Sequence, residues 1–361
     1  MALLKNTRRW FLKNTVLGAA LASTPSLLRA ENAAPKKLQT QLTKAYGFEV
    51  PIISAGMAFV ATADLPIAVS KAGGLGVMSG SGLPPDYLKA QIQKMKMALG
   101  NKPFGVNFIP RFIQIDHIEA CIIEKVPVVV FFWDDVPPQY LSRLKANNIK
   151  IWVQIGSYAE AQAAVKAGFD AIIVQGLEAG GHNKSSASLF SLLPNIVKAV
   201  APIPVIASGG IADGQGLAAA LTLGAQAVSV GTRFLATNEA NAHAEYKKRV
   251  VDAEVHDTVR HNIFGFDFTD ATVRGIRNEI VAEWEGKDNP APYLGKDPNS
   301  FPIIGENKTM GPIRKFSGVL PTPETTGDFE QMSLLAGESV GLIKDIKPAA
   351  EVVRQMFNEA I

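Results

Sequence analysis

One short segment places glycines beside an ionisable side chain: residues 174–186 read VQGLEAGGHNKSS. The apolar run Ala171–Val174 leads into it, and His182 is one of only five histidines in the chain. Two successive glycines, Gly180 and Gly181, permit backbone conformations and close approaches that other residues forbid. A neutral imidazole can accept a proton, and its cation can bind an anion. A lone histidine is more often a structural or surface residue, so the segment by itself leaves open whether His182 carries such chemistry.

Two other apolar runs end in glycine and hydroxyl residues that could bind a phosphate. Residues 204–221 read PVIASGGIADGQGLAAAL, and residues 227–237 read AVSVGTRFLAT. Glycines allow a tight turn, and backbone N–H groups at the start of a following helix point at an anion. Ordinary strand-to-helix turns would show the same glycines. The residues predicted to form the phosphate site are Ser208, Gly209, Gly210, Gly231 and Thr232.

Three neutral amides, Asn107, Gln154 and Gln175, lie in or directly after apolar runs. A ring of amides can bind the carbonyls and nitrogens of a heterocycle, and with a phosphate site it favours the cofactor FMN. Each amide alone could equally cap a loop or satisfy a backbone group. No metal is expected, because the only metal-ligating side chain close to His182 in sequence is Glu178, and such a pair makes a poor site.

Elements that could position these groups are visible as eight apolar runs. Most are rich in valine and isoleucine without polar alternation, as strands buried on both faces are. The runs are Pro51–Ala55, Gly76–Ser79, Phe104–Ile109, Val126–Phe132, Ile149–Ile155, Ala171–Val174, Pro204–Ala207 and Ala227–Val230. Helix-like stretches between them are Ala63–Ala72, Pro85–Leu99, Pro138–Ala146, Tyr158–Ala167 and Gln215–Leu223.

Strand–helix units of about 20–30 residues predict an α/β fold, a (β/α)8 TIM barrel whose active site lies at the carboxyl ends of its strands. A doubly wound sheet is the alternative. The barrel is assigned to residues 40–245. Residues 246–361 are more polar and contain proline and glycine clusters, so they are expected to form a helical and loop extension packed on the barrel mouth.

The first 34 residues have the pattern of an export signal. A basic segment with the string TRRWFLK is followed by a short apolar stretch and small residues. The string resembles a twin-arginine signal, which implies export of the folded protein to the periplasm by the twin-arginine machinery. A disordered basic tail is the alternative, and an uncleaved leader would act as a membrane tether.

The charge balance gives no sign of a nucleic-acid partner. The net charge of +3 comes from the leader, since the residues after position 30 carry 31 basic and 33 acidic side chains. Cys121 is the only cysteine, which excludes an intrachain disulfide and a multi-cysteine metal site. Assembly into a homo-oligomer is left open.

Three stretches together resemble the nitronate monooxygenase family, formerly called 2-nitropropane dioxygenases. They read QGLEAGGHN, SGGIADGQGLAAALTLGAQAVSVGTRFLAT and VPIISAGMAFVATADLPIAVSKAGGLGVMSG, and the similarity extends over about residues 45–280. Flavin-dependent enoyl-thioester and NADH:quinone reductases share the glycine–histidine string. The resemblance therefore implies the barrel and FMN more specifically than it implies the substrate.

The resemblance also implies roles for individual residues. His182 would be the catalytic residue above the flavin, and Met57 would pack near the flavin ring. The phosphate would lie on Gly209, Gly210, Gly231 and Thr232, with Ser229 and Val230 contributing. The ring would be contacted by Asn107, Gln175 and Gly180, and Gly181 would help the loop to pass close to it.

This chain departs from the family pattern at Asn183 and Lys184, which follow the histidine, and at Trp133. Trp133 could narrow the substrate pocket or lie in the core. The leading hypothesis is oxidation of alkyl nitronates with O2 to carbonyl compounds and nitrite. The alternatives are an NAD(P)H-dependent FMN reductase acting on a quinone or enoyl thioester, a flavin carrier without catalysis, and a phosphosugar enzyme.

Overall fold

The computed structural model describes residues 38–266, 268, 271–287 and 292–361. The predicted export signal, residues 1–34, lies outside these described residues, so export and signal cleavage stay predictions. Within the described residues, no helix is long and apolar enough to cross a membrane.

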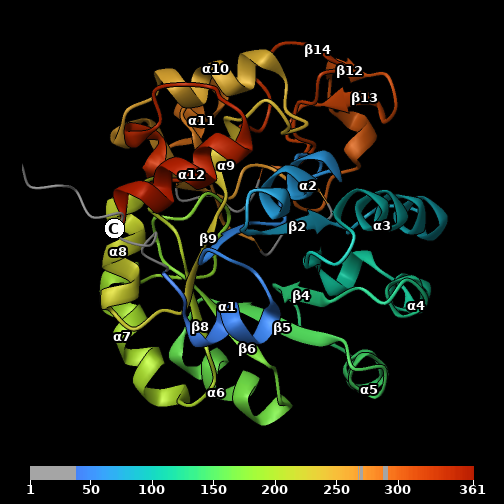
Figure 1. Ribbon diagram of the computed structural model, residues 1–361. Helices are drawn as coiled ribbons and strands as arrows, with labels where there is room; N and C mark the ends of the chain where they lie inside the picture. Colours follow the sequence, from blue (N-terminus) through green and yellow to red (C-terminus); the bar gives the residue numbers. More distant parts are fainter. Residues whose placement is uncertain (1–37, 267, 269–270, 288–291) are drawn as a thin grey trace, which may run out of the picture. The chain divides into compact units, whose positions relative to one another are not determined.

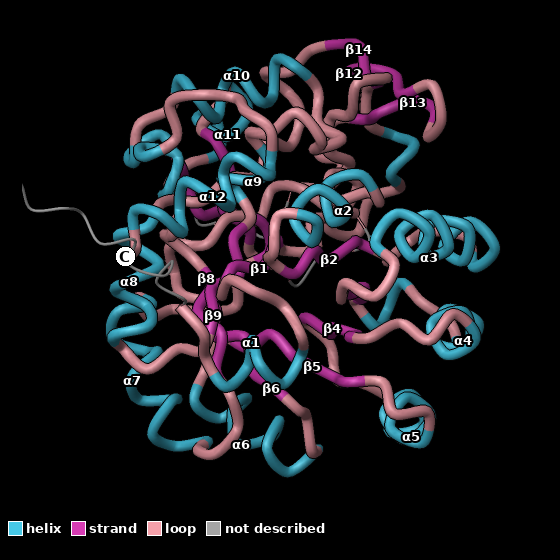
Figure 2. Tube along the Cα trace, viewed as in Figure 1, coloured by secondary structure: helices cyan, strands magenta, loops and turns pink. Residues whose placement is uncertain are grey.

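Eight parallel strands close into a barrel in the order β1-β2-β3-β4-β5-β6-β8-β9, which confirms the predicted TIM barrel and excludes an open doubly wound sheet. Helices surround the strands (Figure 2). The barrel strands are β1 (Ile52–Ser54), β2 (Leu75–Ser79), β3 (Phe104–Phe108), β4 (Val128–Phe132), β5 (Lys150–Ile155), β6 (Ala171–Gln175), β8 (Val205–Ser208) and β9 (Ala227–Val230).

All five predicted helices are present with small shifts at their ends, as α2 (Asp64–Lys71), α3 (Pro85–Leu99), α5 (Pro138–Ala146), α6 (Tyr158–Ala167) and α8 (Gly214–Thr222). Two further helices between barrel strands, α4 (Ile115–Ile123) and α7 (Leu189–Val200), were not predicted. Pro194 lies inside α7. Because proline disfavours the interior of a helix, the sequence of this segment does not predict one.

Side chains alternate along each barrel strand between the interior and the helices. The interior cluster contains Ile53, Leu75, Val77, Val128, Val130, Trp152, Ala171, Ile173, Ile206 and Ala227. Because the alternation has period two, the next inward position of each strand lies one layer nearer its carboxyl end. That layer consists of Ala55, Ser79, Asn107, Phe132, Gln154, Gln175, Ser208 and Ser229, so the polar side chains follow the apolar core directly.

A short helix that the sequence did not predict, α1 (Gln41–Tyr46), packs against the interior cluster. Leu42 and Phe48 are buried in that cluster. The ring of Tyr46 meets Trp152 edge-on with centroids 5.0 Å apart. The amino-terminal side of the core is therefore covered by α1, and the opposite side is left for the functional groups.

The C-terminal extension contains helices, loops and also strands, so the helical and loop prediction was incomplete. Its helices are α10 (Ala244–Asp252), α11 (Glu279–Trp284) and α12 (Ala349–Glu359), and α9 (Thr232–Leu235) precedes it. Short 3-10 turns occupy η1 (Pro110–Phe112) in the barrel, and η2 (Val255–Asp257), η3 (Pro298–Ser300) and η4 (Glu338–Leu342) in the extension. The added strands are β10 (Thr258–His261), β11 (Val273–Ile276), β12 (Ile303–Asn307), β13 (Gly311–Arg314) and β14 (Thr325–Gly327).

Two of these additions connect directly to the barrel. The C-terminal helix α12 contacts both α8 and α2, so it stands in the ring of helices where the barrel closes (Figure 1). Strands β10 and β11 form a three-stranded sheet with β7 (Gly181–His182), in the order β10-β11-β7. The segment that carries His182 is thus held by the extension as well as by the barrel.

Candidate active site

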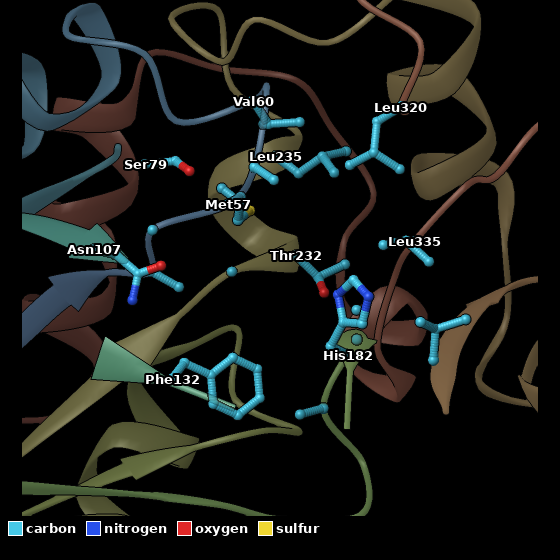
Figure 3. A pocket seen from close by; sticks show the side chains of 18 of the residues that line it. Met57, Val60, Ser79, Asn107, Phe132, His182, Thr232, Leu235, Leu320 and Leu335 are labelled. Atoms are coloured by element: carbon cyan, nitrogen blue, oxygen red, sulfur yellow. The ribbon is translucent and has the colours of Figure 1, made fainter. Parts of the chain in front are cut away.

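One cavity of about 440 Å³ lies at the carboxyl ends of the barrel strands. Figure 3 shows Met57, Asn107, His182 and Thr232 around it. Every residue that the sequence predicted for catalysis or cofactor contact lines this cavity. These residues are Met57, Asn107, Gln154, Gln175, Gly180, Gly181, His182, Ser208, Gly209, Gly210, Ser229, Val230, Gly231 and Thr232.

The amide of Gln175 reaches from the barrel floor to the histidine segment. Its Nε2 donates a hydrogen bond of 2.8 Å to the backbone carbonyl of His182. Its Oε1 is buried and has no hydrogen-bond partner. A buried acceptor left without a donor costs about 1–3 kcal/mol, so this oxygen marks a place for a donor from a ligand.

A second amide, Asn107, is also buried in the cavity wall. Its Nδ2 makes one long contact of 3.4 Å with the carbonyl of Val130. An added Cβ at Gly56 would lie 2.4 Å from the Cβ of Asn107, so glycine at position 56 gives this side chain its space. Because the contact with Val130 is weak, most of the hydrogen-bonding capacity of Asn107 is available to a ligand.

The glycines after β8 and β9 have the geometry expected of an anion site. Gly209 and Gly210 have φ values of 110° and 70°, which only glycine adopts readily. No hydrogen bond from their N–H groups is found within the described part of the chain. After β9, the hydroxyl of Thr232 accepts from the N–H of Gly337 at 3.0 Å, so its own hydrogen remains free to donate. An added Cβ at Gly231 would lie 3.6 Å from the sulfur of Met57, so the Met57 side chain lies beside this part of the site.

The imidazole of His182 packs against two aromatic rings. Its ring centroid lies 4.2 Å from that of Phe268 and 5.8 Å from that of Trp133. Strand β7 pairs with β11, so that His182 lies opposite Val273. Two ring contacts and a strand pairing fix the imidazole at the cavity wall.

The loop before His182 is organised by Asn183, which is fully buried. Its Nδ2 donates to the carbonyls of Gly176, Leu177 and Ala179 at 3.0–3.2 Å. These bonds give Asn183 the role of holding the loop together.

Two arginines of the extension hold the same loop from outside. Arg274 donates to the carbonyl of Leu177, and Arg260 donates to the carbonyl of Asn183. The two arginines are direct partners across β10 and β11, and Arg274 also pairs with Glu338 at 3.0 Å. Burial lowers the pKa of Arg260 from its usual value, with the nearby Arg274 charge as a smaller cause.

Gly180 is required by a contact within the protein. An added Cβ there would lie 2.3 Å from the nitrogen of Gly337, and an added Cβ at Gly337 would lie 2.6 Å from the nitrogen of Gly180. Gly181 has open space around it and a φ of 74°. Both glycines line the cavity, so their contact with a cofactor stays a prediction, and the structure adds that Gly180 makes room for the extension and that Gly181 forms a left-handed turn.

Glu178 is a helix-capping residue. Both oxygens of its carboxylate accept from the N–H of Leu189, at 3.0 and 3.1 Å, at the first residue of α7. A carboxylate at this end of a helix satisfies a free N–H group and complements the helix dipole. The capping bonds account for a carboxylate at position 178, four residues before His182, so no catalytic role is needed to explain it.

The loop after β4 forms part of the surroundings of His182. Trp133 is buried, has a φ of 80°, and contacts both His182 and Phe268. Its carbonyl accepts from Lys184, which also pairs with Glu160 at 2.6 Å. Trp133 thus lies behind the cavity wall, where it supports the histidine.

The extension supplies a wall of the cavity that the sequence did not identify. Its lining residues are Tyr246, Phe264, Gly265, Phe266, Phe268, Val273, Ser317, Gly318, Val319, Leu320, Ser333, Leu335, Gly337 and Ser339. They lie 64–157 positions beyond His182 and follow no strand of the barrel, so no repeat pattern marks them. The described residues contain no cluster of three or more histidine, cysteine or carboxylate side chains suited to a metal ion.

Comparison with known proteins identifies the family. The model of the nitronate monooxygenase family matches residues 39–117 and 109–359. A probable nitronate monooxygenase of Staphylococcus aureus strain Newman is 32% identical over 366 residues, covering 89% of this chain and 97% of that protein. A 5-hydroxy-7a-methyl-1-oxo-octahydro-1H-indene-4-carboxyl-CoA dehydrogenase of Mycobacterium tuberculosis is 34% identical over 352 residues, covering 90% and 97%.

Solved structures give the same fold with different activities. FabK of Thermotoga maritima is 34% identical and superimposes with a TM-score of 0.73, covering 89% of this chain and 96% of that one. A nitroalkane oxidase of Streptomyces ansochromogenes is 26% identical with a TM-score of 0.71, covering 88% and 97%. The similarity therefore spans almost the whole described chain, including the extension.

Proposed function

The chain belongs to the nitronate monooxygenase family, and we propose that it is an FMN-dependent nitronate monooxygenase. The proposed reaction oxidises an alkyl nitronate with O2 and forms a carbonyl compound and nitrite. The family makes the chain an oxidoreductase, whereas the cofactor, the substrate and the role of each residue are parts of the proposal.

The observation that carries the proposal is the buried Oε1 of Gln175, which lacks a donor at the cavity wall. The flavin ring has an N–H group between two carbonyls, and this N–H could donate to Gln175 while Asn107 donates to a carbonyl. The phosphate would be held by the N–H groups of Gly209 and Gly210 and by the hydroxyl of Thr232. When bound, FMN would supply the two-electron redox chemistry that amino-acid side chains lack.

In this proposal His182 acts on the substrate. Its cation would hold the negatively charged nitronate, and its neutral form would accept an α-proton from a nitroalkane. The rings of Trp133 and Phe268 pack against the imidazole and keep it in place. A flavin and a substrate that fill the cavity would displace water and so strengthen the attraction between an imidazolium and a nitronate, because the local dielectric would be lower.

An NAD(P)H-dependent FMN reductase of the quinone or enoyl-thioester type is the second candidate. This candidate is favoured by the similarity to FabK and to a relative named as a carboxyl-CoA dehydrogenase, each of which is 34% identical to this chain. The two candidates differ in the source of electrons, which is the nitronate in the first and a nicotinamide in the second.

The deciding experiment supplies the FMN-loaded protein, in air, with the nitronate of nitroethane and measures nitrite release and O2 uptake. We expect turnover without NADH, and a loss of at least about 100-fold for His182→Ala. The matched control is His256→Ala, because His256 is exposed and does not line the cavity. Oxidation of NADH without nitrite from any nitronate would favour the reductase.

Export to the periplasm by the twin-arginine machinery belongs to the same proposal. The leader sequence supports it, since that pathway exports folded proteins and FMN binding requires a folded barrel. The substrates would then be a small nitronate and O2 outside the cytoplasm. Mutating Arg8 and Arg9 to lysine in the full chain should prevent its appearance in the periplasmic fraction.

A further inference from the structure

Lys184 connects the loops that follow three neighbouring barrel strands. Its Nζ donates to the backbone carbonyl of Trp133 at 2.5 Å and pairs with the carboxylate of Glu160 at 2.6 Å. Trp133 follows β4, Glu160 lies in α6 after β5, and Lys184 lies in the segment after β6. Because β4, β5 and β6 are adjacent in the barrel, one ammonium group joins three loops at the end of the barrel that carries the cavity.

The carboxylate that pairs with Lys184 is itself fixed by the backbone. The Oε2 of Glu160 accepts from the N–H of Gly156 at 2.7 Å. An added Cβ at Gly156 would lie 2.8 Å from the nitrogen of Ser185, so the end of β5 and the Lys184 segment are in close contact. A pair held by such contacts loses less side-chain entropy on forming than two freely rotating surface side chains do.

The backbone of Trp133 is in a conformation that needs support. Its φ of 80° lies in the left-handed region, which a tryptophan side chain disfavours. A residue in such a conformation persists only where its surroundings hold it. The indole packs on Phe132 and Phe268, and the carbonyl accepts from Lys184. Without the bond from Lys184, the backbone of Trp133 should relax toward an ordinary conformation.

The indole of Trp133 contacts both Lys184 and His182. The Nζ of Lys184 lies 5.5 Å from the indole centroid, and the imidazole centroid of His182 lies 5.8 Å from the indole, with the rings inclined at 68°. The position of the indole therefore limits the movement of the imidazole on this side.

Neither Lys184 nor Trp133 is among the described residues that line the cavity. Phe132, the residue before Trp133, does line it together with His182 (Figure 3). An effect of Lys184 on the chemistry must therefore pass through another residue, and the contacts of Trp133 provide that path.

We propose that Lys184 is a positioning residue for the reaction at His182, and that it acts by holding Trp133 against the imidazole. This inference rests on the proposed nitronate chemistry, in which the imidazole must meet the substrate at one place in the cavity. A misplaced catalytic group loses rate even where the fold and the cofactor site are intact, because the reacting groups need a defined geometry.

The first test follows the imidazole by NMR without any turnover. In the FMN-loaded full chain with isotopically labelled histidine, the Cε1–H signal of His182 is assigned by its absence in His182→Ala. Trp133→Leu removes the ring current of the indole, and Lys184→Met should move the signal in the same direction by a comparable amount. Lys166→Met, at an exposed position of α6, is the matched control and should leave the signal in place. An unmoved signal in Lys184→Met would overturn the inference.

A milder variant keeps this test usable if Lys184→Met does not fold. Glu160→Gln retains an acceptor for the N–H of Gly156 and removes the charge that holds Lys184. It should move the His182 signal in the same direction by a smaller amount. An unmoved signal in a folded Glu160→Gln protein would also count against the inference.

Kinetics test the consequence for the reaction. With the nitronate of nitroethane, kcat/KM of Lys184→Met should fall about 10-fold or more, while the affinity for FMN stays within about twofold of the parent. The double variant Trp133→Leu/Lys184→Met should be no slower than Trp133→Leu, because Lys184 acts through Trp133. Losses that add in the double variant, or an affinity for FMN that falls with the rate, would contradict the proposed path.

The two proposals can fail separately. A moved His182 signal in Lys184→Met, without nitrite from any nitronate in the parent, would support the placement of the imidazole by Lys184 and reject only the proposed reaction. Nitrite formation by Lys184→Met at the rate of the parent would leave the reaction standing and reject Lys184 as a positioning residue.

Discussion

The side chain of Gln175 donates a 2.8 Å hydrogen bond to the backbone carbonyl of His182. One end of a single amide therefore holds the histidine segment, and its other end presents an unpartnered oxygen to the cavity. In the proposed function, the same residue binds the flavin and sets the distance between it and the imidazole. Cofactor binding and histidine position are then coupled through Gln175.

Replacing Gln175 with leucine should weaken both functions. The variant loses the bond to His182 and the acceptor for the flavin, so FMN affinity should fall by about 10-fold or more and kcat should also fall. Fluorescence titration of the apoprotein with FMN measures the first effect. Gln162→Leu is the control, since Gln162 is exposed on α6. Unchanged FMN affinity in Gln175→Leu would remove this residue from the cofactor site.

Gly180 and Gly181 should respond differently to alanine. Gly180→Ala places a Cβ 2.3 Å from the backbone of Gly337, and should lower the free energy of unfolding by about 3 kcal/mol or more because two backbones must separate. Gly181→Ala meets no atom within 4 Å and should cost only about 1–2 kcal/mol, from its left-handed conformation. Chemical denaturation of the two variants provides the comparison, and equal losses would contradict the assigned contact.

Glu178 should matter for stability and not for the chemical step. Glu178→Ala removes the acceptor for the N–H of Leu189 and should lower the free energy of unfolding by about 0.5–2 kcal/mol. Glu178→Gln retains an acceptor and should recover part of this loss. Turnover at saturating substrate should stay within about threefold of the parent, well short of the effect of losing a general base. A kcat loss as large as that of His182→Ala would show that the carboxylate takes part in catalysis.

Burial of His261 predicts a loss of stability in mild acid. Burial lowers the pKa of this imidazole to about 4. The unfolded chain, with an ordinary histidine pKa of about 6.5, binds the proton at higher pH than the folded chain does. The free energy of unfolding should therefore fall as the pH decreases from about 6.5 to about 4, by about 3 kcal/mol from this group.

The variant His261→Leu should lack this part of the pH dependence. Denaturation curves at pH 7 and pH 4.5 would be compared for the parent, His261→Leu and His256→Leu, in which an exposed histidine is replaced. The parent and His256→Leu should lose more stability on acidification than His261→Leu. The same loss in all three proteins would show that other groups account for it.

The barrel and its floor were predictable because they follow from local periodicity. Runs such as Ala171–Val174 are apolar without alternation, and the two-residue period then places the next inward side chain, Gln175, at the cavity. The same period brings Asn107 and Ser208 to one layer. Glycine pairs after strands are equally local signals, so the residues of the floor could be identified one segment at a time.

The wall of the cavity that the C-terminal extension supplies could not be predicted in this way. Leu320 and Leu335 reach the cavity through long loops whose course depends on tertiary contacts, among them the mutual approach of Gly337 and Gly180. A glycine reveals that something lies close to it, and leaves open whether that neighbour is a cofactor or another backbone. The strands β10 to β14 were missed because they lack the continuous apolar runs that mark the barrel strands.

The most direct test of the proposed function mixes the FMN-loaded protein with an alkyl nitronate in the absence of O2 and follows the visible spectrum of the flavin. The account predicts bleaching of the oxidised flavin by the nitronate alone, with the rate lowered by at least about 100-fold in His182→Ala. An unchanged spectrum with every nitronate, followed by bleaching on addition of NADH, would contradict it and assign the site to a reductase.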